Sequence, residues 1–493
     1  MLVDSSALVT AVMTASNIKP SFKPSERVIL LGLDFGSTTS SALIASAKVA
    51  KSSATGHMQL DDVQVLYKSD SVFTPFINQA IDTAKVSALI AKWLKQSGIQ
   101  TSQLFSGGSM ITGLAAQADN AAALSKLIID IIGESVIATA YDPCLESWLA
   151  FMGSCGALSR YHADTPILNF DIGGGTTNVA LGINGDVQAT GCYFIGARHF
   201  QFMSGGYELT AISSYGAALL ASLNINKQIG ETLKADEVAK VMAFYVSALE
   251  AIVTADVKFF NAEIVKKHVQ VAISFKQITK PTITFSGGVG ELLYKISADE
   301  TLPTTTFYRD FGIDLALAIS NSALLSAHLK TCIPEHKGRA TVVGLTLHSI
   351  EISGNTVYLP KPDCLPLRDM PIIAKLAADS AIEQWHSAFE LAAKHQHGTC
   401  IQIMATEYSL EKVHALALQI RNALQTSQYA PSQPLLILVE ANIGKALGNY
   451  VSDWGQSQYN LMVIDEVVLR DAHFVHIGRI HQGMIPVSFF GLN

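Results

Sequence analysis

Apolar residues along this chain occur in two patterns, as short continuous runs and as longer stretches with helical spacing. Val28–Leu33 is a continuous apolar run, which indicates a strand buried on both faces. Residues 82–95 and 120–132 instead repeat apolar side chains every three or four positions, which predicts helices. Strands and helices that alternate in this way are typical of an α/β fold, which we expect from Val28 onward.

The same alternation continues through the middle of the chain. Ile167–Phe170 predicts a further buried strand, and Asn184-Gly185 is a turn signal that closes a hairpin after it. The clearest helix extends from Asp236, a candidate N-cap, to Val253, because its apolar side chains fall on one face. Thr282–Phe285 follows a proline and predicts another strand. These elements together indicate a second α/β core.

The last third of the chain predicts a hairpin and then an additional unit. Thr341–Leu347 and Val357–Leu359 are strand-like runs, and residues 353–355 between them favour a turn. Beyond Pro360-Lys361-Pro362 the pattern predicts a strand at 435–439, a helix at 443–447 and a strand at 461–464. At 493 residues the chain is long enough for two to four domains.

Composition and charge narrow the classes of protein to consider. Hydrophobic residues make up 49% of the chain and charged residues 15%, which favours large cores and little disorder. The net charge of −7 argues against general nucleic-acid binding, and no apolar stretch is long enough for a membrane-spanning helix. The six cysteines lack metal-like spacing and no secretory signal is evident, so we expect free thiols in the cytoplasm.

One short sequence occurs twice. Asp34-Phe35-Gly36-Ser37-Thr38-Thr39 returns as Asp171-Ile172-Gly173-Gly174-Gly175-Thr176-Thr177, which we interpret as the same phrase with one inserted glycine. In both copies an apolar strand ends at an aspartate, and a turn of small, hydroxyl-bearing residues leads into another apolar run. Two hairpins of this kind that face each other would hold a metal-chelated polyphosphate from opposite sides.

The residue types in these hairpins suit phosphate and magnesium. Glycine brings backbone N–H donors close to phosphate because it lacks a Cβ, so Gly173–Gly175 is a candidate phosphate site. Asp34 and Asp171 offer the hard oxygen ligands that Mg²⁺ prefers, and they could orient its water or a water that attacks the terminal phosphate. No Walker loop occurs in the chain. One copy alone would be an ordinary tight hairpin, but the repeat favours a nucleotide site.

With a third segment, Ser286-Gly287-Gly288-Val289-Gly290-Glu291, the hairpins resemble the nucleotide signatures of the actin, hexokinase and heat-shock-chaperone ATPase superfamily. The resemblance implies ATP and Mg²⁺ as cofactors. It implies catalytic roles for Asp34, Glu146, Asp171 and Thr176, with the three carboxylates holding Mg²⁺ through water. It also implies nucleotide contacts from the other residues of the signatures, namely Gly36, Ser37, Thr38, Thr39, Gly173, Gly174, Gly175, Thr177, Gly287, Gly288, Gly290 and Glu291.

Further segments narrow the resemblance to one family. These segments are Ile111-Thr112-Gly113, Asn169–Thr176, Ser286–Glu291, Leu365–Arg368, Gly444–Gly448 and Val463–Val468. In this order they resemble the reactivating factors of ethanolamine ammonia-lyase, over nearly the whole chain from about residue 27. The residues that follow Gly113 depart from the expected pattern because they include no basic residue, which puts a phosphate-contacting lysine in doubt.

The resemblance implies an architecture and a division of the chain. We expect an α/β protein with two ribonuclease-H-like lobes, a nucleotide cleft between them and an additional C-terminal α/β unit. The first lobe would span residues 27–155 and be completed by about 338–360, the second 156–337, and the C-terminal domain 361–493. Independently of the resemblance, the residue pattern of 1–26 favours a flexible extension, with an amphipathic docking peptide as the alternative.

The function implied is that of a chaperone-like factor with slow, Mg²⁺-dependent ATPase activity. Its protein partner would be the adenosylcobalamin-dependent ethanolamine ammonia-lyase, from which it would release damaged cobalamin so that intact cofactor can bind. Cobalamin would be handled only through that partner. A homodimer and association with a bacterial microcompartment stay open. Two alternatives on the same fold also remain, a small-molecule kinase and a filament-forming ATPase.

Overall fold

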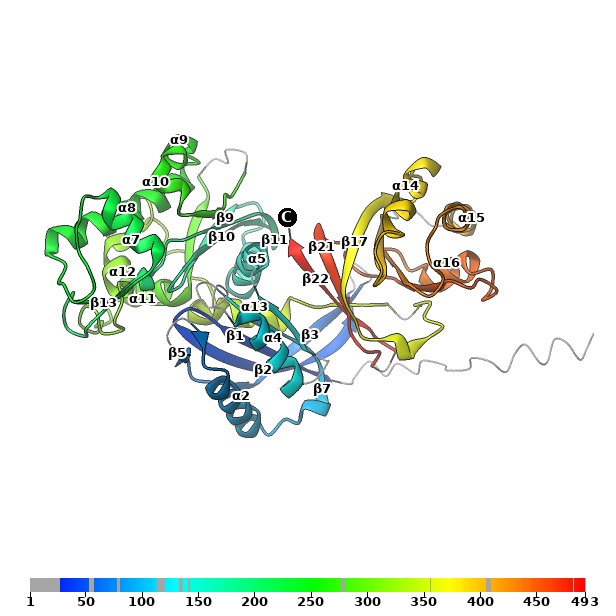
Figure 1. Cartoon of the computed structure of the whole chain (residues 1–493), viewed down its shortest axis with the longest axis horizontal. Coiled ribbons are helices and arrows are strands. Elements are labelled where there is room, and N and C mark those ends of the chain that lie inside the picture. Colours follow the sequence, from blue (N-terminus) through cyan, green and yellow to red (C-terminus); the bar gives the residue numbers. More distant parts are fainter. Residues whose placement is uncertain are drawn as a thin grey trace, which may run out of the picture.

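The computed structural model describes residues 27–492, apart from residues 53–56, 78–79, 113–119, 133–135, 141, 276–279, 355, 405–408 and 482. The expected N-terminal extension and the segment after Thr112 therefore lie outside the described residues. Figure 1 shows two α/β lobes in blue and green, with a third sheet unit in yellow to red beside them. Within the described residues, no helix is long and apolar enough to cross a membrane.

The first lobe is built on a sheet with the strand order β3-β2-β1-β7-β8, in which β4 also pairs with β2. Strands β1, β2 and β3 are antiparallel, whereas β7 and β8 run parallel to β1. On one face of β1, Leu31, Leu33 and Phe35 pack in the cluster that contains α2 and α4. Val28 and Leu30 belong to a second buried cluster, so both faces are buried, which explains the continuous apolar run. The bounds are β1 Arg27–Phe35, β2 Thr39–Lys51, β3 Met58–Lys68, β4 Val72–Phe73, β7 Leu104–Ile111, β8 Val136–Ala140, α2 Thr83–Ser97 and α4 Ala121–Ile132.

The second lobe repeats this arrangement. Its sheet has the order β14-β11-β10-β9-β15, with β9, β10 and β11 antiparallel and β15 parallel to β9. The repeated topology confirms the predicted pair of ribonuclease-H-like lobes. The bounds are β9 Ile167–Ile172, β10 Thr177–Ile183, β11 Asp186–Tyr193, β14 Val269–Val271, β15 Thr282–Ser286, α7 Ser214–Ser222, α8 Ala235–Val253, α11 Gly287–Ser297 and α12 Gly312–Ser320.

Two helices lie between the lobes, α5 (Pro143–Ser154) and α13 (Ala340–Leu347). The predicted hairpin beginning at Thr341–Leu347 is therefore wrong, because this segment is helical. Its β-branched run imitates a buried strand, but residues 340–346 are buried on every side of a helix that packs against α5. Periodicity alone cannot separate these two cases for a short apolar run.

Glycines set the close approach of α5 and α13. A Cβ built on Gly153 would lie 2.0 Å from the carbonyl oxygen of Ala340, and one built on Gly344 would lie 2.0 Å from that of Leu149. Both obstacles are backbone atoms, which cannot move aside as a side chain would. Only glycine at these two positions allows the helices to pack at this distance.

The C-terminal unit contains a seven-stranded sheet with the order β16-β22-β21-β17-β18-β19-β20. Strands β17 to β20 are parallel, and β21, β22 and β16 extend the sheet in antiparallel fashion. Its predicted strands and helix near 435–464 are confirmed as β19, α16 and β20. The bounds are β16 Glu351–Ile352, β17 Leu367–Ala377, β18 Thr399–Met404, β19 Pro434–Val439, β20 Asn460–Ile464, β21 Ala472–Ile477, β22 Pro486–Leu492, α14 Ile382–Ala392, α15 Leu410–Thr426 and α16 Gly444–Val451.

Most other predicted elements are confirmed, with a small shift at one helix start. Asn184 and Gly185 have φ of 53° and 79°, as the predicted turn requires. The N-cap of α8 is Lys234 rather than the predicted Asp236. Asp236 lies in the first turn, where its negative charge interacts favourably with the helix dipole. All six cysteines are free. The remaining short elements are β5 Phe76–Ile77, β6 Ala80–Ile81, β12 Phe200–Phe202, β13 Leu209–Ile212, α6 Gly156–Tyr161, α9 Val257–Asn261, α10 Glu263–Lys266, η1 Thr101–Gln103, η2 Ala197–His199, η3 Lys337–Arg339 and η4 Pro362–Cys364.

Candidate functional site

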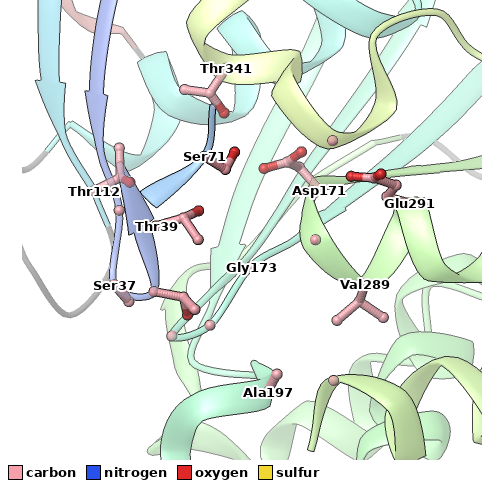
Figure 2. Close-up of a pocket in the computed structure, with 18 of the residues that line it drawn as sticks. Ser37, Thr39, Ser71, Thr112, Asp171, Gly173, Ala197, Val289, Glu291 and Thr341 are labelled. Atoms are coloured by element: carbon pink, nitrogen blue, oxygen red, sulfur yellow. The ribbon is translucent and has the colours of Figure 1, made fainter. Parts of the chain in front are cut away.

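A cavity of about 420 Å³ opens between the two lobes. Figure 2 shows Ser37, Thr39 and Thr112 on the side of the first lobe, facing Asp171 and Glu291 of the second. Of the predicted site residues, fourteen line the cavity: Asp34, Gly36, Ser37, Thr38, Thr39, Glu146, Asp171, Gly173, Gly174, Gly175, Thr176, Gly287, Gly288 and Glu291. The structure thus brings together segments that are far apart in the sequence.

The two repeated hairpins have the same turn. The N–H of Gly36 donates to the carbonyl of Thr39 at 3.0 Å, and the N–H of Gly173 donates to that of Thr176 at 2.9 Å. Strand pairing also agrees, because Asp34 faces Ser41 while Asp171 faces Asn178. The hairpins are therefore equal in length, and the predicted glycine insertion is wrong.

This register explains why Thr177 does not line the cavity. It occupies the place of Ser40, the first residue after the turn that is fully enclosed in the sheet, and it is 0% exposed. Its hydroxyl donates to the carbonyl of Ile195 at 2.7 Å. Thr176, the true counterpart of Thr39, faces the cavity.

This strand register predicts different effects for the same substitution at Thr177 and at Thr176. Thr177→Val should lower the free energy of unfolding by about 1 kcal/mol, because the buried carbonyl of Ile195 loses its donor, and should leave nucleotide affinity unchanged. Thr176→Val should weaken nucleotide binding at nearly unchanged stability. Thermal unfolding and calorimetric titration with ATP measure the two effects, and a loss of ATP affinity in the Thr177 variant would contradict this assignment.

The third signature closes the cavity at the start of α11. Gly287 has φ of 78°, and a Cβ there would lie 2.4 Å from the carbonyl oxygen of Ile172, so this position requires glycine. Gly288 has open space on the cavity side. Gly290 does not line the cavity but packs on the backbone of Phe285. Its predicted nucleotide contact therefore has no support from the geometry.

Three buried carboxyl groups meet in the cavity. Burial, followed by repulsion from Asp171, raises the pKa of Asp34 to about 7, although Thr112 Oγ1 donates to its Oδ1 at 3.4 Å. Burial raises the pKa of Asp171 to about 6. Glu146, in the first turn of α5, has a pKa well above its usual value because of burial and then repulsion from both aspartates. Asp34 and Asp171 therefore exchange protons near neutral pH, as acid–base chemistry requires.

These pKa shifts predict how stability depends on pH. Between about pH 4 and pH 7 the folded chain holds protons on Asp34 and Asp171 that the unfolded chain has released. The free energy of unfolding should therefore fall as pH rises through this window. Thermal unfolding from about pH 5 to about pH 8, without nucleotide, measures the slope. Asp34→Asn should flatten the curve, and a slope that is identical in this variant would contradict the prediction.

The donor set of the cavity fits a hydrated Mg²⁺. Among the residues the structure describes, no group of three or more His, Cys, Asp or Glu side chains is spaced for direct metal ligation. The carboxylates of Asp34, Glu146 and Asp171 and the hydroxyl of Thr112 all present oxygen to the cavity. Mg²⁺ commonly keeps its waters and binds phosphate, so carboxylates at longer range suit it.

Several lining residues come from segments without a recognisable motif. Ser71 and Phe73 lie at the edge of the first lobe, and Tyr308 and Asp310 precede α12 of the second. Arg339 lies just before α13, and its guanidinium donates to the carbonyl of Ser69. No sequence signal connected these residues with the signatures, because only the fold brings them together.

Glycine turns, hydroxyl groups and buried carboxylates between two ribonuclease-H-like lobes define the class of actin-like ATPase folds, which implies nucleotide binding. Within this class, the family model of the ethanolamine utilisation protein EutA matches residues 26–492, and the chain belongs to that family.

Sequence similarity to individual proteins supports this family membership. The chain is 27% identical over 470 residues to ethanolamine ammonia-lyase reactivase EutA of Salmonella typhimurium, which covers 94% of this chain and 97% of that protein. The reactivase EutA of Escherichia coli is 27% identical over 475 residues, with the same coverage. Among solved structures, the Aquifex aeolicus PPX-GPPA enzyme is similar at 13% identity and a TM-score of 0.35, over 57% of this chain and 75% of that one.

Proposed function

We propose that this chain is an ATP-dependent reactivating factor for ethanolamine ammonia-lyase, which releases damaged cobalamin so that intact adenosylcobalamin can bind. The observation that carries the proposal is the pair of equal glycine turns enclosing three buried carboxyl groups between two lobes. Membership of the EutA family and the reactivase relatives support this choice of partner. We also propose that the chain works in the cytoplasm, in association with a bacterial microcompartment.

The residues of the cavity have separate roles toward the nucleotide. The backbone N–H groups of Gly174 and Gly175 and the hydroxyls of Thr39 and Thr176 bind phosphate oxygens. Mg²⁺, when bound, would neutralise phosphate charge and favour in-line attack. Asp171, fixed by Ser286 Oγ at 2.5 Å, orients the attacking water, and Glu146 accepts its proton. Burial raises the pKa of the Glu146 carboxyl, which makes its carboxylate a stronger base for this proton.

Helix α5 provides a physical connection from the nucleotide to the C-terminal unit. It presents Glu146 to the cavity, while its N-cap Asp142 accepts a hydrogen bond from the N–H of Gly491 at 2.6 Å. The guanidinium carbon of Arg470 lies 4.4 Å from the ring centroid of Trp148 on the same helix. We infer that closure of the cleft around ATP moves α5 and thereby the C-terminal unit, which would act on the lyase.

The experiment uses lyase inactivated by damaged cobalamin, with free adenosylcobalamin, Mg²⁺ and ATP, in the presence and absence of the full chain. We expect ammonia production to recover only when both the chain and ATP are present. ADP release that depends on an added metabolite would indicate the kinase instead. ATP-dependent light scattering from polymers would indicate the filament-forming ATPase.

A further inference from the structure

The cavity has an unbalanced charge. Among the described residues, it is lined by five acidic side chains, Asp34, Glu146, Asp171, Glu291 and Asp310, and by two basic ones, Lys295 and Arg339. Lys295 is 3.2 Å from Glu291, and the guanidinium of Arg339 donates to the Ser69 carbonyl. A polyphosphate in such surroundings needs a further positive charge, because repulsion between like charges grows in a partly buried cleft.

Arg198 begins beside the second glycine turn. Its backbone N–H donates to the carbonyl of Gly174 at 2.6 Å. A Cβ built on Gly174 would lie 3.2 Å from the Cβ of Arg198, so this side chain starts in contact with the turn. Asp310, which lines the cavity, interacts electrostatically with Arg198. The residue therefore lies at the boundary of the candidate phosphate site.

The guanidinium of Arg198 reaches across to the first lobe. Its central carbon lies 5.9 Å from the ring centroid of Phe73, which lines the cavity from β4. An aromatic face stabilises a guanidinium and leaves its N–H donors free for an anion in the plane of the guanidinium. Nη1 of Arg198 is buried and, within the described residues, has no hydrogen-bond partner.

A second unpaired donor lies on the other side of the same glycine. Thr38 Oγ1 of the first lobe is also buried without a hydrogen-bond partner among the described residues. A Cβ built on Gly174 would lie 2.0 Å from this atom, so the two turns touch at this point. Two unpaired donors, one from each lobe, thus flank Gly174. A buried donor left without an acceptor is costly, which favours an anionic ligand here.

We propose that Arg198 binds the polyphosphate of the nucleotide at the Gly173–Gly175 turn. Phe73 of the first lobe holds the guanidinium in this position when the cleft is closed. The assignment rests on the proposed function, because it requires a nucleotide in this cavity. Arg198 adds a positive charge beside the acid-rich lining. Its bidentate geometry suits phosphate oxygens better than a lysine would.

The test is calorimetric titration of the full chain with ATP and Mg²⁺, and separately with adenosine. Arg198→Gln should weaken ATP binding about ten- to hundredfold, as expected for a lost charge-assisted hydrogen bond, and leave adenosine affinity unchanged. The ATP affinity of Arg198→Lys should lie between those of Arg198→Gln and the wild type. The matched control is Arg309→Gln, an exposed arginine close to Arg198 in the same lobe, which should bind ATP normally.

The outcomes separate this assignment from the function on which it rests. A wild-type chain that binds no ATP overturns both. A wild-type chain that binds ATP, together with an Arg198→Gln variant of equal ATP affinity, overturns the role of Arg198 alone. Equal losses of ATP and adenosine affinity in that variant would also overturn it, because they would show a merely structural contribution. Thermal unfolding of each variant confirms that the chain is folded.

Discussion

Asp171→Asn should abolish the ATP-dependent recovery of ammonia production, with ATP turnover lowered by about a thousandfold. Asp171 is only 7% exposed and accepts a hydrogen bond from Ser286 Oγ. Ser286 is held in turn by Asn169 Nδ2 at 2.9 Å, and Thr284 Oγ1 donates to Asn169 Oδ1 at 3.0 Å. This chain of hydrogen bonds across β9 and β15 fixes the orientation of the carboxylate.

Asp171→Asn removes the negative charge of this side chain but nearly preserves its shape. It keeps an acceptor for Ser286, and it removes a buried carboxyl group that repels Asp34 and Glu146. Its free energy of unfolding should therefore not fall, so lost activity cannot be attributed to misfolding. The control is Asp186→Asn, an exposed aspartate at the far end of the next strand pair, which should act as wild type. An Asp171→Asn variant with normal turnover would contradict the proposed site.

Sequence patterns located the two lobes and most of the cavity because both depend on local regularities. The aspartate near the end of each strand and the glycine turn after it are visible in the sequence, and the structure places the two turns on opposite sides of one cavity. Where the local signal was ambiguous the prediction was wrong. Two consecutive threonines allowed two alignments of the hairpins, and strand pairing selects the one that buries Thr177.

The remaining site residues depend on contacts that no local pattern records. Phe73 follows a strand at the edge of one lobe and Arg198 follows the hairpin of the other, and they meet only because the lobes close on each other. The same holds for α13, whose apolar run would suit a strand in isolation. It is a helix that packs against α5, with Gly344 at the point of closest approach.

Gly344→Ala should lower the free energy of unfolding by about 3 kcal/mol, an overpacking cost that exceeds the usual helix preference for alanine. Its new methyl group would lie 2.0 Å from the carbonyl oxygen and 2.6 Å from the carbonyl carbon of Leu149, so α5 and α13 must separate. Because α5 also carries Glu146, nucleotide affinity should fall together with stability.

Gly156→Ala is the matched control, because Gly156 is also a helical glycine and begins α6, two residues after the end of α5. Its new methyl group would lie 3.5 Å from Met152 Cε, which is an ordinary contact with a flexible side chain. Alanine is preferred over glycine in helices, so this variant should be as stable as the wild type or more stable. Denaturant unfolding measures both. Equal stability of the two variants would show that the closeness of α5 and α13 does not depend on glycine, and would remove the proposed route from the nucleotide to the C-terminal unit.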